Sequence, residues 1–406
     1  MFDLLIRNAV IADPLSGFMG KSDVAVEDGL IAEVARTLPA ASARETIEGS
    51  GLILQPGIVE ARLAVSSNPF DPLAAAKSGT TTLIAGTSSP ELLLNNLAQS
   101  CCGLTVAILK TLLPGENLTG PNPMTSEIEA FIETALEEGA FGIKLLGTGF
   151  PMTPEAAERC FAAAKKIGAW ISVRPGTTQS FRTSFERLEE VVHLAQGIPF
   201  LLTRLDDFSD DPGRTAALLE AHPEIITEIC LEKPDGSLLS HAFAGKKRSD
   251  GSSLIDFMSS QDLPADVASV LDHGRTWMER GILTPVEFAR RTALLPARAL
   301  GFAAKGFIAP GADADIVLYD PKTGKAVHSF ACGRPILQNG IVVGKGGIVL
   351  TTAAGEDAVE RHGLCAHAIP GGVPNLDRSD PSGPAPECER ALPPISARTP
   401  RAGRII

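Results

Sequence analysis

Short runs of alternating apolar and polar residues predict β-strands at both ends of the chain. The amino-terminal end reads FDLLIRNAVIADPLSG and then SDVAVEDGLIAEVA, with turn signals in DPLSG and EDG. The far end has the same short strands and contains Asn339-Gly340, a dipeptide typical of a tight hairpin. Two β-rich ends around a long middle predict one small β-sandwich domain, composed of residues 1–55 and 305–350.

The middle of the chain alternates short apolar runs with helical patterns, which is typical of parallel βα units. Helical periodicity is clear in PEAAERCFAAAKKIG and in SFERLEEVVHLAQ. The strand-like runs are residues 57–65, 80–86, 104–110, 141–147, 169–176, 198–206, 225–231 and 253–260. These runs predict an α/β fold, a (β/α)8 TIM-like barrel over residues 56–304. A doubly wound sheet is the alternative, but no glycine-rich fingerprint follows the first strand.

The last part of the chain has a different character. Residues 370–406 are rich in Pro, Ser and Arg and show no apolar periodicity. Such a sequence buries too little apolar surface to offset the entropy lost on ordering. We therefore interpret residues 351–406 as a Pro/Arg-rich tail that is either disordered or bound along a partner.

Composition narrows the classes of function. The formal net charge of −12 and a sequence pI of about 5.2 argue against binding to nucleic acid or to an anionic membrane surface. The seven cysteines show no repeated CxxC spacing. No apolar run reaches the roughly 20 residues of a membrane span, and no signal-peptide pattern precedes the first strand. We expect a reduced, cytoplasmic protein.

Several segments together carry a resemblance to a known family. They are the opening strand with its DPLSG turn, QPGIVEARL, SGTTTLIAG, FGIKLLG and PARALGFAAKGFIAPGADADIVLYDP. These segments resemble the amidohydrolase superfamily, and within it dihydroorotase and related cyclic amidases. The resemblance covers roughly residues 1–350 and implies a barrel with a β-sandwich. An activity has to be argued from the site, because one fold hosts many functions.

The resemblance implies a binuclear metal site, normally of zinc, at the carboxyl ends of the barrel strands. The family's ligands are an HxH pair, a carbamylated lysine, two further histidines and an aspartate. In this sequence the HxH pair falls on Arg62 and Ala64, and the lysine falls on Lys144. The two later histidines fall on Arg174 and Arg204.

The position of the family's aspartate has two candidates in LIDFMSSQDLP. The simplest register places Gln261 there, and Asp262, one residue further, is a displaced substitute. Arginine stays protonated and offers only hydrogen-bond donors, so it does not ligate a metal. None of the seven histidines occupies a matched position. We therefore predict that the binuclear site is absent, that no metal cofactor is bound, and that Lys144 is not carbamylated.

Two interpretations of the replaced ligands remain open. In the first, the strand ends have drifted, and the arginines pair with nearby acids such as Glu60, Asp206 or Glu228. In the second, cationic side chains converge at the barrel mouth and bind a small carboxylate or phosphate. The residues of this predicted anion pocket are Arg62, Lys144, Arg174 and Arg204.

Two other segments carry chemistry of their own. In RHGLCAHA the spacing of His362, Cys365 and His367 is compatible with a zinc ion, although no second ligand pair lies nearby. The basic run GKKRSD at residues 245–250 is interpreted as a solvated loop, with contact to an acidic partner as the alternative.

The predicted function is that of a non-catalytic structural or regulatory subunit that assembles with copies of itself or with a partner enzyme. Dihydroorotase-like chains that scaffold aspartate transcarbamoylase are the family's precedent. The alternative is a hydrolase of non-peptide carbon–nitrogen bonds, in cyclic or linear amides, with an atypical or metal-poor site. Its candidate catalytic residues are Lys144, Asp262, Gln261 and Glu228. A weaker resemblance to formylmethanofuran dehydrogenase-type complexes adds a further alternative, an amidohydrolase-type subunit of a formyl-transfer complex.

Overall fold

The computed structural model describes most of the chain and leaves gaps at several loops and at the carboxyl-terminal end. The described ranges are residues 1–62, 72–100, 102–146, 152–176, 183–231, 242–260 and 269–378. Five of the six internal gaps follow directly, or within a few residues, the carboxyl end of a barrel strand. All structural statements below concern the described ranges.

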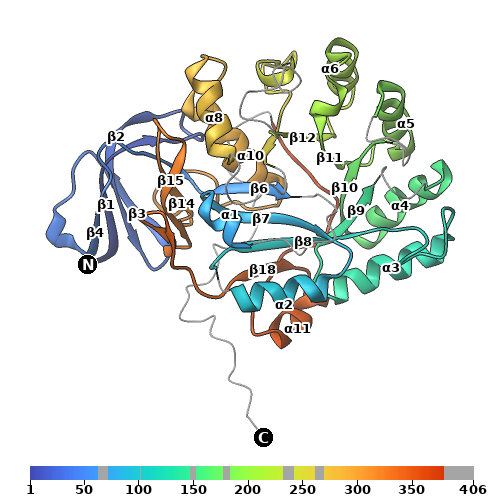
Figure 1. Ribbon diagram of the computed structural model, residues 1–406, viewed down its shortest axis with the longest axis horizontal. Helices are drawn as coiled ribbons and strands as arrows, with labels where there is room; N and C mark the ends of the chain where they lie inside the picture. The colour runs from blue at the N-terminus through green and yellow to red at the C-terminus, as the bar shows by residue number, and fades with distance from the viewer. Residues whose placement is uncertain are drawn as a thin grey trace, which may run out of the picture.

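A parallel barrel forms the middle of the molecule (Figure 1). Its strands are β6 (Ile58–Arg62), β7 (Thr80–Thr87), β8 (Thr105–Thr111), β9 (Gly142–Leu146), β10 (Trp170–Arg174), β11 (Leu201–Leu202), β12 (Ile226–Cys230) and β13 (Phe257–Ser259). Each strand pairs in parallel with the next one along the chain. The predicted (β/α)8 architecture is confirmed. Every predicted strand overlaps one of these strands, and β7 and β8 each end one residue beyond the predicted range.

Helices cover the outside of the barrel. They are α1 (Pro72–Lys77), α2 (Pro90–Ser100), α3 (Thr125–Glu137), α4 (Pro154–Ile167), α5 (Phe185–Ala195), α6 (Pro212–Ala221), α8 (Val270–Glu279), α9 (Pro285–Ala289), the π-helix η3 (Arg290–Leu294) and α10 (Leu295–Ala299). Local sequence fixes their ends. The hydroxyl of Thr153 accepts a hydrogen bond from the Ala156 backbone at the start of α4. Gly168 ends the same helix in the left-handed conformation, with φ of 83°.

The barrel closes between its last and first strands through a side chain. Glu60 of β6 is fully buried, and one carboxylate oxygen accepts hydrogen bonds from the Ser260 backbone N–H at 2.8 Å and from the Ser260 hydroxyl. The other oxygen accepts from the Thr80 hydroxyl at 2.7 Å. A buried carboxylate needs such partners to offset its desolvation. Glu60 therefore ties β6 and β7 to the end of β13.

Both ends of the chain build a second domain, a nine-stranded sheet. Its strands are β1 (Phe2–Ala12), β2 (Met19–Glu27), β3 (Leu30–Ala35), β4 (Ala43–Glu48), β5 (Ile53–Pro56), β14 (Ile316–Asp320), β15 (Lys325–Ala331), β16 (Arg334–Gln338) and β17 (Ile341–Val342). The antiparallel pairing of β5 with β14 joins the two ends of the chain. The β-domain predicted from both termini is thus present.

The predicted boundary of the tail, residue 351, is wrong. The chain continues through β18 (Ile348–Thr351), α11 (Glu356–Arg361) and β19 (Cys365–Ala368). β18 joins the barrel sheet beside the first half of β8, whereas β9 pairs with the second half of β8. Each of these elements is too short for apolar periodicity to appear in the sequence, yet together they bury Val349, Val359 and Leu364 in one cluster. The predicted tail beyond residue 378 lies outside the described residues.

None of the described helices is long and apolar enough to cross a membrane.

Candidate functional site

Along each barrel strand, the side chains of alternate residues point into the barrel interior. Ile143 and Leu145 of β9 pack toward the helices, in one cluster with Phe161 of α4. Successive residues of a strand face opposite sides of the sheet, so Lys144 points into the barrel. Its side chain is 1% exposed. The residue matched to the family's carbamylated lysine is therefore deeply buried within the barrel.

Hydroxyl side chains lie on both sides of Lys144. The register of the sheet places Thr111 of β8 and Ser172 of β10 next to it. Both residues are buried, and within the described part of the chain neither hydroxyl oxygen has a hydrogen-bond partner. Burying a hydroxyl without a partner costs free energy. The row formed by Thr111, Lys144 and Ser172 is therefore polar, and its two hydroxyl groups make no hydrogen bond with the described residues.

Two arginines at the barrel mouth share one carboxylate. Arg174 ends β10, and its Nε and Nη2 each donate to Oδ2 of Asp207 at 3.2 Å. Arg204 follows β11 and donates from Nη2 to the other oxygen of Asp207 at 3.4 Å. The Nε of Arg204 also lies 3.2 Å from Oδ2 of Asp206. The guanidinium groups at two matched ligand positions are thus paired with acids of this chain.

The local backbone brings these charges together. Arg204 adopts the left-handed conformation, with φ of 64° and ψ of 49°, which is uncommon outside glycine. The short 3-10 helix η2 (Leu205–Phe208) follows at once. This sharp turn directs Asp206 and Asp207 back toward the arginine that precedes them, where both form ion pairs with it.

Two carboxylates also join the strand ends at this mouth through hydrogen bonds. Glu228 of β12 accepts hydrogen bonds from the Arg204 backbone N–H at 2.8 Å and from the Ser259 hydroxyl. Asp206 accepts a hydrogen bond from the Cys230 backbone N–H at 2.9 Å. Carboxylates therefore link the ends of β11, β12 and β13, in addition to the barrel's own ladder.

Burial shifts the acidity of two of these carboxyl groups. Desolvation raises the pKa of Asp206 to about 6, although the neighbouring Arg204 partly opposes the shift. Desolvation also raises the pKa of Glu228 to about 7, against the hydrogen bond from Ser259. When Glu228 holds its proton, the guanidiniums of Arg174 and Arg204 face two ionised carboxylates. Among these five described side chains, the positive and negative charges then balance.

The other residues predicted for the site fall outside the described part of the chain. Arg62 ends β6, but its side chain is not among those described. Ala64, Gln261 and Asp262 lie in the gaps at residues 63–71 and 261–268. The convergence of all four cationic residues, and the choice between Gln261 and Asp262, therefore stay predictions.

The described residues do not fit the metal centre that the fold implies. Guanidinium groups have no lone pair to give a metal, and those of Arg174 and Arg204 are engaged with carboxylates. Within the described ranges, no group of three or more His, Cys, Asp or Glu side chains is placed to hold a metal ion.

The second candidate for zinc is spread over two elements. The Nδ1 of His362 lies 2.8 Å from the Ala358 carbonyl oxygen at the end of α11. Cys365 and His367 occupy β19, where the His367 ring stacks on Phe302 at a centroid distance of 6.4 Å. The described surroundings thus give each histidine a different contact.

Sequence reasoning named only part of this mouth. It named Asp206 and Glu228 as possible partners of the arginines, and it missed Asp207 and Ser259. The signal for Asp207 was present in the run RLDD, because residues three apart in a tight helical turn lie on one side. Ser259 gave no signal, since only the pairing of β12 with β13 places it beside Glu228.

The raised pKa of Glu228 predicts a pH-dependent stability. An unfolded glutamate titrates near pH 4.3. The folded state therefore holds this proton more tightly, so the contribution is full below about pH 4 and is lost as pH rises through 7. We expect the free energy of unfolding of the wild type, relative to Glu228→Gln, to fall by roughly 2 kcal/mol between pH 5 and 8. Urea unfolding at both pH values measures this difference, and parallel pH profiles for the two proteins would contradict it.

Comparison with curated proteins gives partial matches. No family model matches the chain. It is 35% identical to the urease subunit alpha of Sulfurisphaera tokodaii over 102 residues, which are 22% of this chain and 18% of that protein. It is 29% identical to the dihydroorotase of Streptococcus pneumoniae over 189 residues, which are 42% of each protein. The chain thus spans less than half the length of either relative.

Solved structures match over much more of the chain. L-hydantoinase (dihydropyrimidinase) from Arthrobacter aurescens has a TM-score of 0.66 at 16% identity, covering 86% of this chain and 99% of that one. N-acyl-D-glutamate deacylase from Bordetella bronchiseptica, solved with zinc and a phosphonate inhibitor, has a TM-score of 0.64 at 17% identity. The match covers 85% of this chain and 98% of that one. The formyltransferase/hydrolase complex from Methylorubrum extorquens, solved with methylofuran, contains a chain with a TM-score of 0.64 at 15% identity. The match covers 88% of this chain and 94% of that one. The resemblance to the amidohydrolase superfamily is therefore confirmed, and the chain has the fold of that superfamily's hydantoinases and dihydropyrimidinases.

Proposed function

We propose that this chain is a non-catalytic subunit with an amidohydrolase fold, which works as a structural or regulatory part of an assembly. The observation that carries the proposal is the set of ion pairs at the barrel mouth. Arg174 and Arg204 stand at two matched ligand positions, and Asp206 and Asp207 pair with them at 3.2–3.4 Å. Side chains that are bound to each other in this way are not available to bind a metal.

The same contacts weigh against the anion pocket. A carboxylate or phosphate would have to compete with Asp207 for two guanidinium groups that it already bridges. Asp207 is held at an effective concentration that a free ligand does not reach, because it lies in the same turn as Arg204. The interpretation that the arginines pair with the chain's own acids is therefore the one we adopt.

The described acids at the mouth also have structural partners that do not point to catalysis. Both oxygens of Glu228 accept hydrogen bonds, from the Arg204 backbone and from the Ser259 hydroxyl. A general base needs an oxygen within reach of the proton that it removes. Glu228 instead holds two strand ends together, which supports a scaffold rather than the alternative hydrolase.

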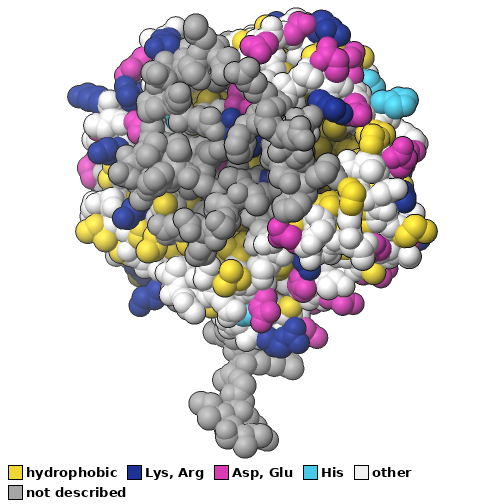
Figure 2. Space-filling model, turned by 45° about the vertical axis from the view of Figure 1, so that its right-hand side comes forward, with side chains coloured by type: hydrophobic (Ala, Val, Ile, Leu, Met, Phe, Trp, Pro, Cys, Tyr) yellow, Lys and Arg dark blue, Asp and Glu magenta, His cyan; other side chains and the backbone are white. Residues whose placement is uncertain are grey.

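An assembly with other subunits fits two further observations. A chain of the Methylorubrum extorquens formyltransferase/hydrolase complex shares this fold, which supports a subunit of a formyl-transfer complex as the second candidate. Acidic and basic side chains are interspersed over the described part of one molecular face (Figure 2). Such a mixed surface favours a protein partner over nucleic acid.

A turnover assay joined to native mass spectrometry tests the proposal. The protein is incubated with hydantoin, dihydroorotate and an N-acyl amino acid, each with added zinc or manganese. We expect no hydrolysis above the buffer blank and a defined assembly, either of several copies or with a partner chain. Hydrolysis of any of these amides by a monomer that has no partner would contradict the proposal.

Removing the shared carboxylate separates the two interpretations of the arginines. We expect Asp207→Ala to lower the free energy of unfolding by about 2 kcal/mol, because partly buried Arg174 loses its described carboxylate partner and Arg204 loses one of two. Exposed Asp210 supplies the matched control, and Asp210→Ala should change the free energy of unfolding by less than about 0.5 kcal/mol.

Phosphate then reports on the freed cations. Replacing chloride by phosphate at constant ionic strength should leave the melting temperature of the wild type unchanged and raise that of Asp207→Ala. If phosphate raises the melting temperature of the wild type, and Arg174→Gln abolishes that rise, the anion pocket is the correct interpretation.

A further inference from the structure

The chain after β19 crosses the amino-terminal end of the barrel, opposite the mouth. We call residues 369–378 the arm. It begins where the Ile369 backbone donates to the Thr351 carbonyl at 2.9 Å. Its Gly371 passes so close to Gly168, just before β10, that an added Cβ would come within 2.6 Å of a carbonyl oxygen. Leu376 packs on the cluster that fills the barrel interior, and the red trace follows this path in Figure 1.

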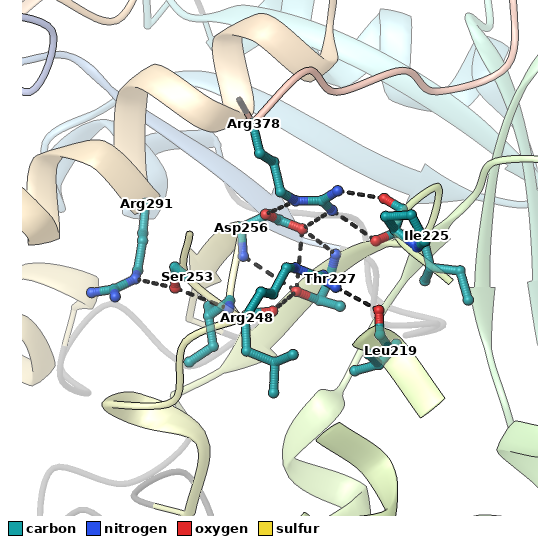
Figure 3. A network of polar contacts seen from close by, with 11 residues as sticks. Leu219, Ile225, Thr227, Arg248, Ser253, Asp256, Arg291 and Arg378 are labelled. Carbon is teal, nitrogen blue, oxygen red and sulfur yellow. Dashed lines mark hydrogen bonds and ion pairs between the residues drawn. The ribbon is translucent and has the colours of Figure 1, made fainter. Parts of the chain in front are cut away.

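The arm ends in a slot that encloses a guanidinium group (Figure 3). Arg378 donates from Nε to Oδ1 of Asp256 at 2.7 Å and from Nη2 to Oδ2 at 2.5 Å. Its Nη2 also donates to the Ile225 carbonyl at 2.7 Å, and its Nη1 donates to the Pro223 carbonyl. Asp256 is fully buried just before β13, and the carbonyls precede β12. The slot thus matches the fork of an arginine in charge and in geometry.

A second guanidinium lies beside this pair. Arg248 extends under Arg378 and Asp256 in Figure 3, and its Nη1 donates to the Leu219 carbonyl at 2.5 Å. The side chain is 6% exposed, although the basic run around it was predicted to be a solvated loop. That prediction is wrong for Arg248, while Lys247 and Ser249 are exposed as expected.

The donors of Arg248 are not all used. Its Nε and Nη2 atoms are buried and have no hydrogen-bond partner among the residues that the structure describes. Burial and the charge of Arg378 both lower the pKa of Arg248, which is the effect of two like charges held close together. Two guanidinium groups therefore stand at one carboxylate, and only Arg378 makes a bidentate pair with it.

The presence of two guanidinium groups beside one carboxylate affects how the arm could be released. If Arg378 left alone, Asp256 would remain a buried carboxylate without a counter-charge, which costs several kcal/mol. The Thr227 backbone N–H, at 2.9 Å, offsets only part of that cost. Arg248 lies below the same carboxylate in Figure 3 and carries an unused Nε–Nη2 edge, which is the edge that binds carboxylates in bidentate fashion.

We propose that Asp256 and the carbonyls of Pro223 and Ile225 form a guanidinium slot that holds the arm as a releasable latch. When the arm leaves, Arg248 becomes the partner of Asp256. The barrel then keeps its fold while its amino-terminal end is uncovered. The latch works on the face opposite the mouth and does not depend on whether the mouth is catalytic.

A double-mutant cycle tests the latch. Arg378→Ala, Arg248→Ala and the double variant are compared in the full chain by thermal unfolding and by hydrogen exchange of residues 365–378. We expect Arg378→Ala to speed exchange of these residues by about tenfold or more while the melting temperature falls by at most about 3 °C. Arg248→Ala should leave the exchange unchanged. The double variant should lose at least about 3 °C more than the sum of the single losses.

Two controls keep the outcome clear. Arg361→Ala, at an exposed arginine of α11, should change neither measurement. Arg378→Lys keeps the charge and loses the fork, so exchange of the arm should lie between that of the wild type and that of Arg378→Ala. Additive losses in the double variant would show that Arg248 does not replace Arg378. Exchange of the arm at the wild-type rate in Arg378→Lys or Arg378→Ala would show that the slot does not hold the arm.

Discussion

The pairing of Asp207 with two arginines is the interaction on which the functional account depends. A single carboxylate, 14% exposed, bridges the ends of β10 and β11 and occupies the donors of Arg174 and Arg204. Without it, Arg174 would lose its described carboxylate partner and Arg204 would keep Asp206 alone, so the site would attract an anion. With it, the carboxyl ends of the strands are held together by charges that belong to this chain.

The network extends this constraint to the neighbouring strands. Asp206 and Glu228 accept backbone hydrogen bonds across β11 and β12, and the Ser259 hydroxyl brings in β13. Glu60 makes the corresponding connection from β13 to β6 and β7, where the barrel has to close. Each contact contributes little compared with the burial of the apolar core, but net stabilities are only about 5–15 kcal/mol. Carboxylates therefore play a large part in fixing the register of short strands such as β11 and β13, which are only two and three residues long.

Much of the fold was predictable because the barrel repeats the same pattern many times. Each strand is a run of apolar residues between helical segments, so one unclear element does not change the prediction of a barrel fold. The segment from β18 to the arm has no such repetition. There β18 pairs with β8 and β19 pairs with β18, and the sequence does not reveal these pairings. Arg248 was misjudged for a related reason: local composition indicated solvent, whereas a tertiary contact buries it.

The candidate site was predictable in position but not in chemistry. Matched motifs located Lys144, Arg174 and Arg204 at or near the strand ends. Sequence alone left open whether the arginines bind a ligand or pair with acidic residues of the chain, because this depends on the turn after β11. The left-handed backbone of Arg204 and the helical turn behind it bring Asp207 into contact, and neither is apparent from residue types.

Metal content tests the central claim most directly. The protein is purified without chelator and analysed by inductively coupled plasma mass spectrometry for zinc, manganese, iron, nickel and cobalt. The account predicts less than about a tenth of an equivalent of any of these metals, because structural and catalytic sites hold their metals tightly. One or two equivalents, retained through purification, would contradict it and would return hydrolysis to consideration.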